Sequence, residues 1–364
     1  MKVIQPRPFH PGKALFVFSV LLAVTIYHFF FRDTPGPDHV HWTGSTMGTH
    51  YVIRIAQSPL TQNSLRELHS EIEAYLLKAN KQMSTYLRDS EITKFNQSRT
   101  TDPFEVSPAF AEVTRYAVKL SEMTDGAFDP TIDPLLALWG FGPDANIRRQ
   151  LPDTMEIERA MGQTGYEHIA VPADNLIQKR IPEITLNLNA IAKGYAADRV
   201  SEILNSHGLT NHYVELGGDL IVSGKNHDGK KWRIGIEIPD PDSEPGTSLA
   251  GIANISNAAV AGSGDYRDVW TGPDGETYSH ILDPRTGAPV RHNLGAVTVI
   301  APTCMKADGI ATAVFVMGPE EGVRWINERE NTEAMFIYRN DENSYGYIFS
   351  DGFKEEASFD QLID

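Results

Sequence analysis

An aspartate and a threonine in the C-terminal part of the chain have the spacing of two oxygen ligands on one helical face. Asp308 and Thr312 lie four residues apart in Ala307-Asp-Gly-Ile-Ala-Thr312, and side chains with this separation are neighbours on a helix. A carboxylate and a hydroxyl are donors of the kind that Mg²⁺ binds together with water and substrate phosphates. The same spacing also fits an aspartate that stabilises a helix start beside an incidental threonine, so the pair needs support from other segments.

A second segment, Asn187-Leu-Asn-Ala-Ile-Ala-Lys-Gly-Tyr195, could receive an anionic group. Its pattern predicts a strand end that runs into a helix, and the free N–H groups at such a helix start bind anions. Lys193 would add a positive charge, while Asn187 and Asn189 add side-chain donors and acceptors. An ordinary strand-to-helix turn with a solvated lysine is the alternative.

A third segment, Ser279 to Gly287, gathers His280, Asp283 and Arg285 ahead of a turn. Histidine titrates near neutral pH and can move a proton, and arginine can bind a phosphate through two parallel hydrogen bonds. A turn that contains a packed histidine fits the sequence equally well. Composition and spacing alone therefore indicate a possible metal and phosphate site, without naming a substrate.

Four further segments have the composition of ligand-contacting turns or loops, although such segments are common. Glycine-rich turns let a backbone approach a ligand closely, and aromatic residues or methionines beside polar groups can contact a flat ligand. More often such residues belong to the core. The segments are Gly217-Gly-Asp219, Gly262-Ser-Gly-Asp-Tyr266, Gly126-Ala-Phe-Asp-Pro-Thr131 and Met83-Ser-Thr-Tyr86.

The elements that must position these residues alternate between strand and helix patterns, without a repeat or a low-complexity break. Strands in pairs separated by helices predict an α+β fold, a single large domain with a mostly antiparallel sheet and packed helices. Strands are predicted around Tyr51–Ile55 and at Tyr213–Val222, Trp232–Ile238 and Gly295–Ala301. Helices are predicted across Leu65–Ala79, from Ser107-Pro108, and at Ala192–Asn205, Met305–Met317 and Pro319–Glu328.

Charge and cysteine content exclude several classes of protein. The 364 residues carry 32 Lys and Arg against 48 Asp and Glu, a formal net charge of −16. This field repels phosphate backbones and argues against general nucleic-acid binding. The single cysteine, Cys304, cannot form an internal disulfide or a zinc-finger or iron–sulfur framework.

The N-terminal region predicts a membrane anchor. Residues 14–31 contain no charged side chain, and 18 residues in a helix reach about 27 Å, close to the thickness of a bilayer core. Lys2, Arg7 and Lys13 precede the run, so the N-terminus should remain in the cytoplasm. We expect a cytoplasmic tail at 1–13, an uncleaved signal anchor at 14–31, a linker at 32–41 and an extracytoplasmic catalytic domain at 42–364. A buried core helix is the alternative for 14–31.

Eight segments, taken in order, resemble the ApbE family of FAD:protein FMN transferases. Each segment alone is weak, but their order and spacing cover nearly all of the chain after the anchor. The segments are Thr46-Met-Gly-Thr49, Met83-Ser-Thr-Tyr86, Gly126-Ala-Phe-Asp-Pro-Thr131, Ala190-Ile-Ala-Lys-Gly-Tyr195, Glu215-Leu-Gly-Gly-Asp219, Gly262-Ser-Gly-Asp-Tyr266, His280-Ile-Leu-Asp-Pro-Arg-Thr-Gly287 and Ala307-Asp-Gly-Ile-Ala-Thr312.

The resemblance implies an ApbE-like, T-fold-related enzyme that uses Mg²⁺ to move FMN from FAD to a Thr or Ser hydroxyl of a target protein, with release of AMP. The target would carry an Asp-x-Gly-Ala/Ser-Thr type motif and would be a subunit of a membrane redox complex. The residues implied to contact FAD are Met47, Tyr86, Ala127, Phe128, Asp129, Asn187, Lys193, Asp219 and the Ile281 backbone, with Asp265 lining the same pocket. The implied Mg²⁺ ligands are Ala190 and Ala311 through their carbonyl oxygens, Asp308 and Thr312.

The resemblance also frames the catalytic roles and the alternatives. His280 is the candidate general base, Asp283 its orienting partner, and Lys193 an electrostatic aid. The family usually has Asp where Asn187 stands, and a lipoprotein-type signal where this chain has a plain anchor. With water as the nucleophile, the same site would be a Mg²⁺-dependent FAD pyrophosphatase. A non-catalytic exported flavin-binding protein is the further alternative.

Overall fold

The computed structural model describes residues 35–142, 150–244, 246–341 and 344–362. The predicted tail and anchor, and the first residues of the predicted linker, lie outside this set. Within these ranges, no helix has both the length and the apolar character needed to cross a membrane. Strand β1 begins at His39, inside the predicted linker, because residues 39–41 pair with residues 54–56 of the next strand.

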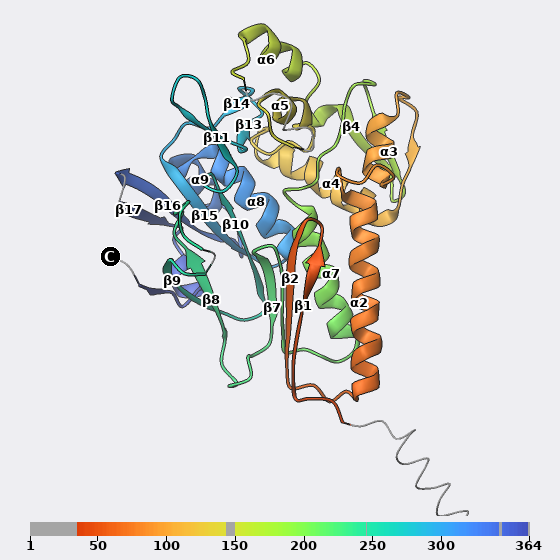
Figure 1. Ribbon diagram of the computed structural model, residues 1–364, viewed down its shortest axis with the longest axis vertical. Helices are drawn as coiled ribbons and strands as arrows, with labels where there is room; N and C mark the ends of the chain where they lie inside the picture. The colour runs from red at the N-terminus through yellow and green to blue at the C-terminus, as the bar shows by residue number, and fades with distance from the viewer. Residues whose placement is uncertain (1–34, 143–149, 245, 342–343, 363–364) are drawn as a thin grey trace, which may run out of the picture.

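An eight-stranded sheet forms the centre of the described part of the molecule (Figure 1). Its order is β1-β2-β6-β7-β10-β15-β16-β17, and every neighbouring pair is antiparallel. The predicted α+β class with a mostly antiparallel sheet is confirmed. The strands are β1 His39–Thr46, β2 Thr49–Ala56, β6 His212–Leu216, β7 Asp219–Ser223, β10 Ala258–Gly264, β15 Leu294–Ala301, β16 Glu333–Asp341 and β17 Ser344–Phe349.

Smaller sheets and hairpins surround the main sheet. A three-stranded sheet has the order β18-β9-β8, and another has the order β3-β5-β4. Strands β11 and β12, and strands β13 and β14, form two two-stranded sheets. Their strands are β3 Phe104–Glu105, β4 Ile169–Ala173, β5 Leu176–Lys179, β8 Trp232–Glu237, β9 Leu249–Ile255, β11 Val269–Thr271, β12 Thr277–Ser279, β13 Leu282–Asp283, β14 Ala288–Pro289 and β18 Asp360–Gln361.

The helices follow the predicted patterns closely. In the predicted helix across Leu65–Ala79 the apolar positions are buried, and the Thr61 side chain accepts a hydrogen bond from Ser64 N at its start. Ser107 caps the helix that begins at Pro108, as its sequence predicts. The helices are α2 Gln62–Met83, α3 Glu91–Gln97, α4 Pro108–Met123, α5 Asp133–Leu138, α6 Thr154–Met161, η2 Tyr166–His168, α7 Ala192–Ser206, α8 Cys304–Met317, α9 Pro319–Asn327 and α10 Phe353–Glu356.

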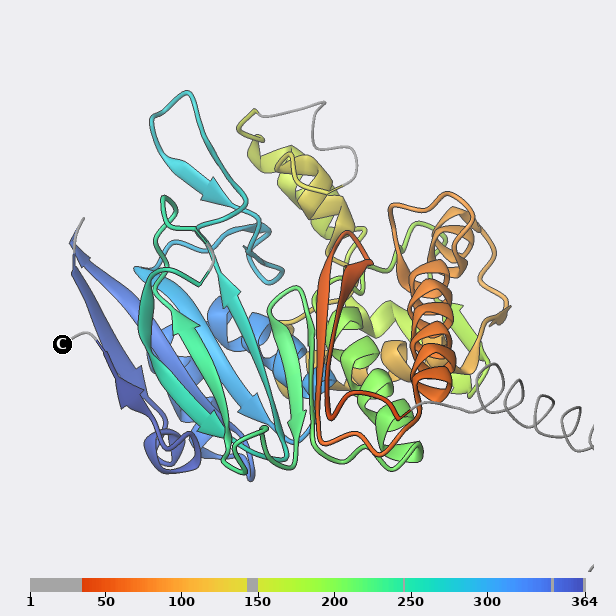
Figure 2. The same ribbon diagram turned by 60° about the horizontal axis from the view of Figure 1, so that its bottom comes forward.

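The main sheet separates two hydrophobic cores, because successive side chains of a strand point to opposite faces. In β10, Ala259 and Ala261 belong to the core shared with α7 and α8, which we call the helix-side core. Ala258 and Val260 belong to a second core shared with β8, β9 and α10, which we call the small-sheet core. Figure 2 shows the helices and the small sheet on opposite sides of the main sheet.

Two sequence predictions need correction. The stretch Tyr213–Val222 is a hairpin rather than one strand, because Gly217 and Gly218 have φ values of 62° and 97° and reverse the chain. The residues before α7 do not end a strand. Residues 184–188 form an irregular segment, which is held by hydrogen bonds such as Asn187 N to Pro130 O at 2.7 Å.

Candidate active site

Helices α7 and α8 meet closely, and a glycine makes this contact possible. A Cβ on Gly194 would lie 2.8 Å from the backbone nitrogen of Met305 and closer still to the carbonyl oxygen of Cys304. The Asp198 carboxylate of α7 accepts hydrogen bonds from Cys304 N at 2.7 Å and Met305 N at 2.8 Å. It therefore satisfies the first two amide groups of α8, which have no partner within their own helix.

Asp308 makes the reciprocal contact from α8 to the start of α7. Its Oδ2 accepts a hydrogen bond from Gly194 N at 3.0 Å and lies 3.7 Å from the Lys193 Nζ. The same ammonium group lies 2.6 Å from the Asp219 Oδ2, at the start of β7. The fold thus brings the Lys193 segment and the Asp308 segment together, as the sequence predicted, and adds Asp219.

The cluster of Lys193, Asp219 and Asp308 is buried and carries one negative charge in excess. The side chains of Asp219 and Asp308 are only 5% and 6% exposed. Burial and then the neighbouring Asp219 carboxylate raise the pKa of Asp308 to about 7, against the lowering effects of Lys193 and Gly194 N. Burial alone would lower the pKa of Lys193, but the two carboxylates outweigh it and raise that pKa. Such a cluster attracts a cation.

The donors around Asp308 fit a hard divalent cation. Thr312 lies one helical turn further along α8, and its Oγ1 is 3.2 Å from the Ser263 Oγ of β10. No hydrogen bond from the described residues reaches the carbonyl oxygen of Ala190, just before α7. Ala311 is fully buried in α8. Carboxylate, hydroxyl and carbonyl oxygens suit Mg²⁺. In the part of the chain that the structure describes, no group of three or more His, Cys, Asp or Glu could hold a metal, so one carboxylate would share the ion with neutral oxygens.

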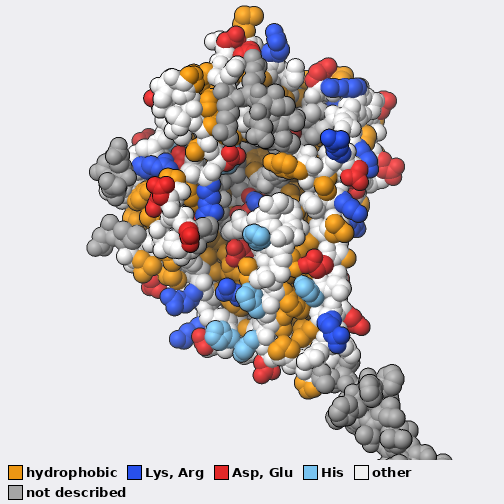
Figure 3. Space-filling view, viewed as in Figure 1, with side chains coloured by type: hydrophobic (Ala, Val, Ile, Leu, Met, Phe, Trp, Pro, Cys, Tyr) orange, Lys and Arg blue, Asp and Glu red, His pale blue; other side chains and the backbone are white. Residues whose placement is uncertain are grey.

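Two of the residues implied to contact FAD belong to loops. Met47 and Gly48 form the two-residue turn between β1 and β2, with φ values of 49° and 74°, and Met47 packs partly against the helix-side core. Tyr86 is 64% exposed. Figure 3 shows the molecule from the same side as Figure 1. A hollow lies near the middle of this face, with acidic and basic atoms inside it and hydrophobic side chains at its rim.

The side chains in the loop of Ala127, Phe128 and Asp129 lie mostly below the protein surface. Ala127 and Phe128 are at most 4% exposed and belong to the helix-side core. The Asp129 carboxylate accepts hydrogen bonds from Thr131 N, Thr131 Oγ1 and Tyr166 N at 2.6–3.0 Å. Burial raises the pKa of Asp129, although these donors oppose the shift. These side chains therefore shape the loop from within.

Asn187 is buried, and its side chain is fixed on both sides. Its Oδ1 accepts a hydrogen bond from Asn189 N at 2.9 Å, and its Nδ2 donates to the Asp133 Oδ1 at 2.6 Å. Loss of water around its carboxyl raises the pKa of Asp133 to about 6, while the bond from Asn187 opposes the shift. No sequence motif pointed to Asp133, the first residue of α5.

His280 is held by a backbone carbonyl and an aromatic ring. Its Nδ1 lies 3.3 Å from the carbonyl oxygen of Asp268, and a carbonyl can only accept, so Nδ1 is the donor in this bond. The ring also stands edge-on to Phe141, with centroids 6.4 Å apart. The neighbouring Ile281 is buried, and its carbonyl accepts a hydrogen bond from Val290 N.

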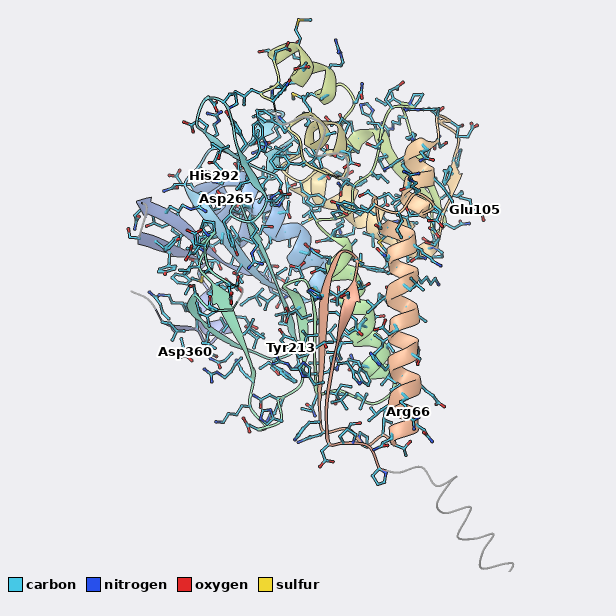
Figure 4. All side chains as sticks on the ribbon, in the orientation of Figure 1. Arg66, Glu105, Tyr213, Asp265, His292 and Asp360 are labelled. Atoms are coloured by element: carbon cyan, nitrogen blue, oxygen red, sulfur yellow. The ribbon has the colours of Figure 1, made fainter. Side chains whose placement is uncertain are left out.

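Asp283 has another partner than the sequence suggested, and Asp265 has one that the sequence did not indicate. Asp283, expected to orient His280, instead binds Arg285 through both carboxylate oxygens at 2.9–3.2 Å. The Arg285 backbone also bonds to Asp283, and the Arg285 guanidinium lies 3.7 Å from the Glu321 carboxylate of α9. Asp265 forms a two-pronged ion pair with Arg339 of β16, at 3.0 and 2.6 Å. Figure 4 shows Asp265 near His292.

Sequence reasoning missed Asp198, Asp133, Asp268 and Ser263 as individual residues. Asp198 had a local signal, because it lies one helical turn after Gly194 and so on the same face of α7. Asp268 contributes only its backbone carbonyl, which residue type cannot reveal. The contact of Asp133 with Asn187 joins residues 54 positions apart, which no local pattern can indicate.

Comparison with known proteins gives a consistent result. The ApbE family matches residues 47–336. The chain is 41% identical to the FAD:protein FMN transferase of Vibrio cholerae serotype O1, over 88% of this chain and 91% of that protein. It is 32% identical to the protein of the same name from Escherichia coli K12, over 92% and 95%.

Solved structures agree with the sequence comparison. The flavin transferase ApbE from Vibrio cholerae superposes with a TM-score of 0.78 at 39% identity, covering 87% of this chain and 98% of that one. The apo form of the Pseudomonas stutzeri flavinyl transferase ApbE gives a TM-score of 0.77 at 34% identity, covering 90% and 98%. The chain therefore belongs to the ApbE family of flavin transferases.

Proposed function

We propose that this enzyme transfers FMN from FAD to a threonine or serine hydroxyl of a target protein, uses Mg²⁺ and releases AMP. The observation that carries the proposal is the contact of Asp308 with Gly194 N and Lys193 at the junction of α7 and α8. It gathers a buried excess negative charge, which attracts a cation, beside a lysine, which attracts phosphate.

The chemistry follows from the negative charge of the diphosphate. When bound by Asp308, Thr312 and the Ala190 and Ala311 carbonyl oxygens, Mg²⁺ would act as a Lewis acid that offsets this charge and orients the phosphates. Lys193 adds a fixed positive charge on the same side. The acceptor oxygen forms a bond to the flavin-side phosphorus, and the bond from that phosphorus to the bridging oxygen breaks. AMP leaves with the bridging oxygen.

The proton of the acceptor hydroxyl goes to His280. Its Nε2 is the ring nitrogen left free by the bond from Nδ1 to the Asp268 carbonyl, so the backbone sets the tautomer that a general base needs. Asp283 supports the nearby turn through Arg285 rather than the imidazole. A His280→Ala enzyme that transfers at an undiminished rate from pH 6 to 8 would contradict this role.

The main test removes the carboxylate of the metal site. Asp308→Ala, incubated with FAD, Mg²⁺ and an acceptor domain, should show no in-gel flavin fluorescence, because losing one electrostatic group in such sites costs about 3–4 kcal/mol of barrier. Asp308→Asn, of nearly equal shape, should fail likewise. Asp174→Asn, at a carboxylate that is 93% exposed, is the matched control. Wild-type labelling by the alanine variant would refute the metal assignment.

Mass spectrometry separates transfer from hydrolysis. An FMN-sized adduct on the acceptor threonine supports transfer, whereas free FMN and AMP without an adduct indicate a pyrophosphatase. Retention of FAD without AMP would indicate a non-catalytic flavin-binding protein. We propose that the acceptor carries an Asp-x-Gly-Ala/Ser-Thr type motif in a membrane redox-complex subunit, which co-expression of such a subunit can test.

We also propose that residues 14–31 anchor the enzyme in the cytoplasmic membrane, with its catalytic domain outside. The uncharged run and the preceding Lys2, Arg7 and Lys13 support this orientation. The full chain should fractionate with membranes, and external protease should digest the catalytic domain in spheroplasts. Release of a chain that lacks residues 1–34 into the soluble fraction would support the anchor, whereas protection of the domain from protease would contradict the orientation.

A further inference from the structure

We propose that Asp133 and Asn187 form a donor–acceptor pair that reads the hydrogen-bonding edge of one heterocycle of the bound dinucleotide. The inference rests on the proposed function, because it takes a flavin dinucleotide as the ligand. It adds Asp133 as a residue that determines which ligands bind.

The geometry of the pair is fixed by the protein itself. Asn189 N donates to the Asn187 Oδ1, so the other end of the amide, Nδ2, must point to the Asp133 Oδ1, 2.6 Å away. The backbone of Asn187 is held in turn by Pro130 O. One N–H of Nδ2 remains for a ligand, next to a carboxylate that can accept.

The Asp133 carboxylate has spare capacity for a donor. Among the residues that the structure describes, no cation shifts the pKa of Asp133 and its side-chain partner is the neutral amide of Asn187. A carboxylate can accept about four hydrogen bonds, and a poorly hydrated carboxylate without enough donors is costly. An N–H group of a ligand would supply the missing donor.

Asp133 is joined to segments that carry other candidate ligand contacts. Its partner Asn187 bonds through its backbone to Pro130, next to Asp129, and precedes Ala190 on the segment that leads into α7. Burial of the Tyr86 hydroxyl, and then the carboxylates of Asp268 and Asp133, raise the pKa of Tyr86. The Tyr86 ring is largely exposed and offers a flat face on which a heterocycle can stack. The Asp268 carbonyl bonds to His280, and we assign the Asp133–Asn187 pair to the same site as these candidate contacts.

Two edges of FAD match an adjacent donor and acceptor. Adenine presents its amino group, a donor, beside N1, an acceptor. The isoalloxazine ring presents its N3–H, a donor, beside a carbonyl. In either case Asp133 would accept the ligand N–H, and Asn187 would donate to the neighbouring acceptor. Hypoxanthine has a carbonyl in place of the adenine amino group and would meet Asp133 lone pair to lone pair, and a methyl group on flavin N3 removes the other donor.

Calorimetry with Mg²⁺ present tests the pair on two sets of ligands: ADP against IDP, and FMN against N3-methyl-FMN. The wild type should prefer the first member of one set by about tenfold to a hundredfold, because a site built to hydrogen-bond a donor rejects an analogue that lacks it. Asp133→Asn can keep its bond with Asn187 through the amide oxygen and turn an NH₂ group toward the ligand, so it should shrink or reverse that preference.

The set of ligands that shows the preference identifies which heterocycle the Asp133–Asn187 pair contacts. Asp174→Asn, an equal chemical change at an exposed site, should leave both ratios unchanged. Wild-type ratios close to one for both sets would overturn the proposal, even if Asp133→Asn failed to fold. Equal ratios in the wild type and a folded Asp133→Asn would also overturn it. Binding does not require turnover, so a preference that Asp133 controls, in an enzyme without FMN-adduct formation, would refute the proposed function alone.

Discussion

Lys193 is the residue whose charge makes the candidate site stable as a protein structure. It is the cation within reach of the two buried carboxylates of Asp219 and Asp308, at 2.6 and 3.7 Å. Its own side chain is 27% exposed, so the cluster opens toward solvent on the lysine side. Removing one partner of such a group is much more costly than replacing the whole group, because a charge is left buried without compensation.

Lys193→Met should therefore lower the free energy of unfolding by about 3–5 kcal/mol, measured by chemical denaturation with a metal chelator present. Adding Asp219→Asn should recover much of this loss, because the double variant keeps the single excess negative charge of the wild type. Lys78→Met, at an exposed position of α2, is the matched control. An undiminished stability, or a double variant no more stable than Lys193→Met, would contradict this account.

Residue types and short spacings identified the segments of the site, but not the pairs within it. Asp308 and Thr312 could be associated because helical periodicity is local, whereas the contact of Lys193 with Asp219 depends on the placement of β7. The pairing of His280 with Asp283 was wrong for a local reason. The Asp283 carboxylate binds the backbone and side chain of Arg285, two residues away, and not the imidazole.

At the scale of elements, the contact of α7 with α8 sets the site. Each helix supplies a carboxylate to the other helix start, Asp198 to Cys304 and Met305, and Asp308 to Gly194. Burial raises the pKa of Asp198 to about 6 despite these donors. The two helices therefore constrain each other, and a change in their separation moves Asp308 relative to Lys193.

Gly194→Ala should destabilise the protein by about 3 kcal/mol, at the upper end of overpacking costs. Its Cβ would overlap backbone atoms of Cys304 and Met305, which cannot move aside as a flexible side chain does. FMN transfer should fall with it, because the separation of the helices changes. Gly162→Ala is the control, since its Cβ would meet only ordinary contacts at 3.5 Å or more. Thermal unfolding and gel fluorescence measure both effects, and a fully stable, active Gly194→Ala would contradict the account.

A second arrangement of elements holds the irregular segment before α7. The ammonium of Lys179, on β5, is buried and donates to the carbonyl oxygens of Phe95, Ser98 and Ile184 at 2.9–3.0 Å. Asn96 of α3 bonds to both N and O of Leu186. The end of α3 thus fixes the backbone that leads to Asn187. The three N–H donors of the ammonium match three acceptors, and a neutral amine would have only two.

The buried ammonium of Lys179 should make the stability of the protein depend on pH in alkaline solution. Burial, and then Arg99, lower the pKa of Lys179 to about 8 in the folded protein, while Glu183 opposes the shift. Between this value and about 10.4 in the unfolded chain, the unfolded chain holds more protons, so stability gains with rising pH. Relative to Lys179→Met, the wild type should gain up to about 3 kcal/mol from pH 7.5 to 10.5. Denaturation of both proteins at several pH values measures this, and a constant or shrinking difference would contradict it.

The elements were more predictable than their ends and connections. Amphipathic spacing located α2 and α4, because each buries one face regardless of its partners. The stretch Tyr213–Val222 looked like one strand, since its apolar residues continue across Gly217-Gly218. The positive φ values of these glycines and the pairing of β6 with β7 show the reversal. Residues 184–188 have strand-like composition, but they bond to Asn96, Pro130 and Lys179 rather than to a neighbouring strand.

At the scale of the whole molecule, the main sheet separates two hydrophobic cores that have different roles. The helix-side core lies under α7 and α8 and supports the site. The small-sheet core lies on the other face, where Phe353 of α10 is fully buried beside Phe349 and Phe359, with ring centroids 5.6 and 5.7 Å away. The sequence indicated that the sheet is mostly antiparallel, but not the order of its strands. That order depends on pairings such as β7 with β10 and β2 with β6, which join distant segments.

Phe353→Ala should therefore separate stability from function. Truncating a fully buried phenylalanine costs about 3–5 kcal/mol, which chemical denaturation will detect as a lower midpoint. The KM for FAD and the rate of FMN transfer should stay at wild-type values well below the unfolding transition, since the cavity opens on the face of the sheet away from α7 and α8. Met155→Ala, at a side chain that is 69% exposed, should change neither quantity. A raised KM in folded Phe353→Ala would show that the two faces of the sheet are coupled.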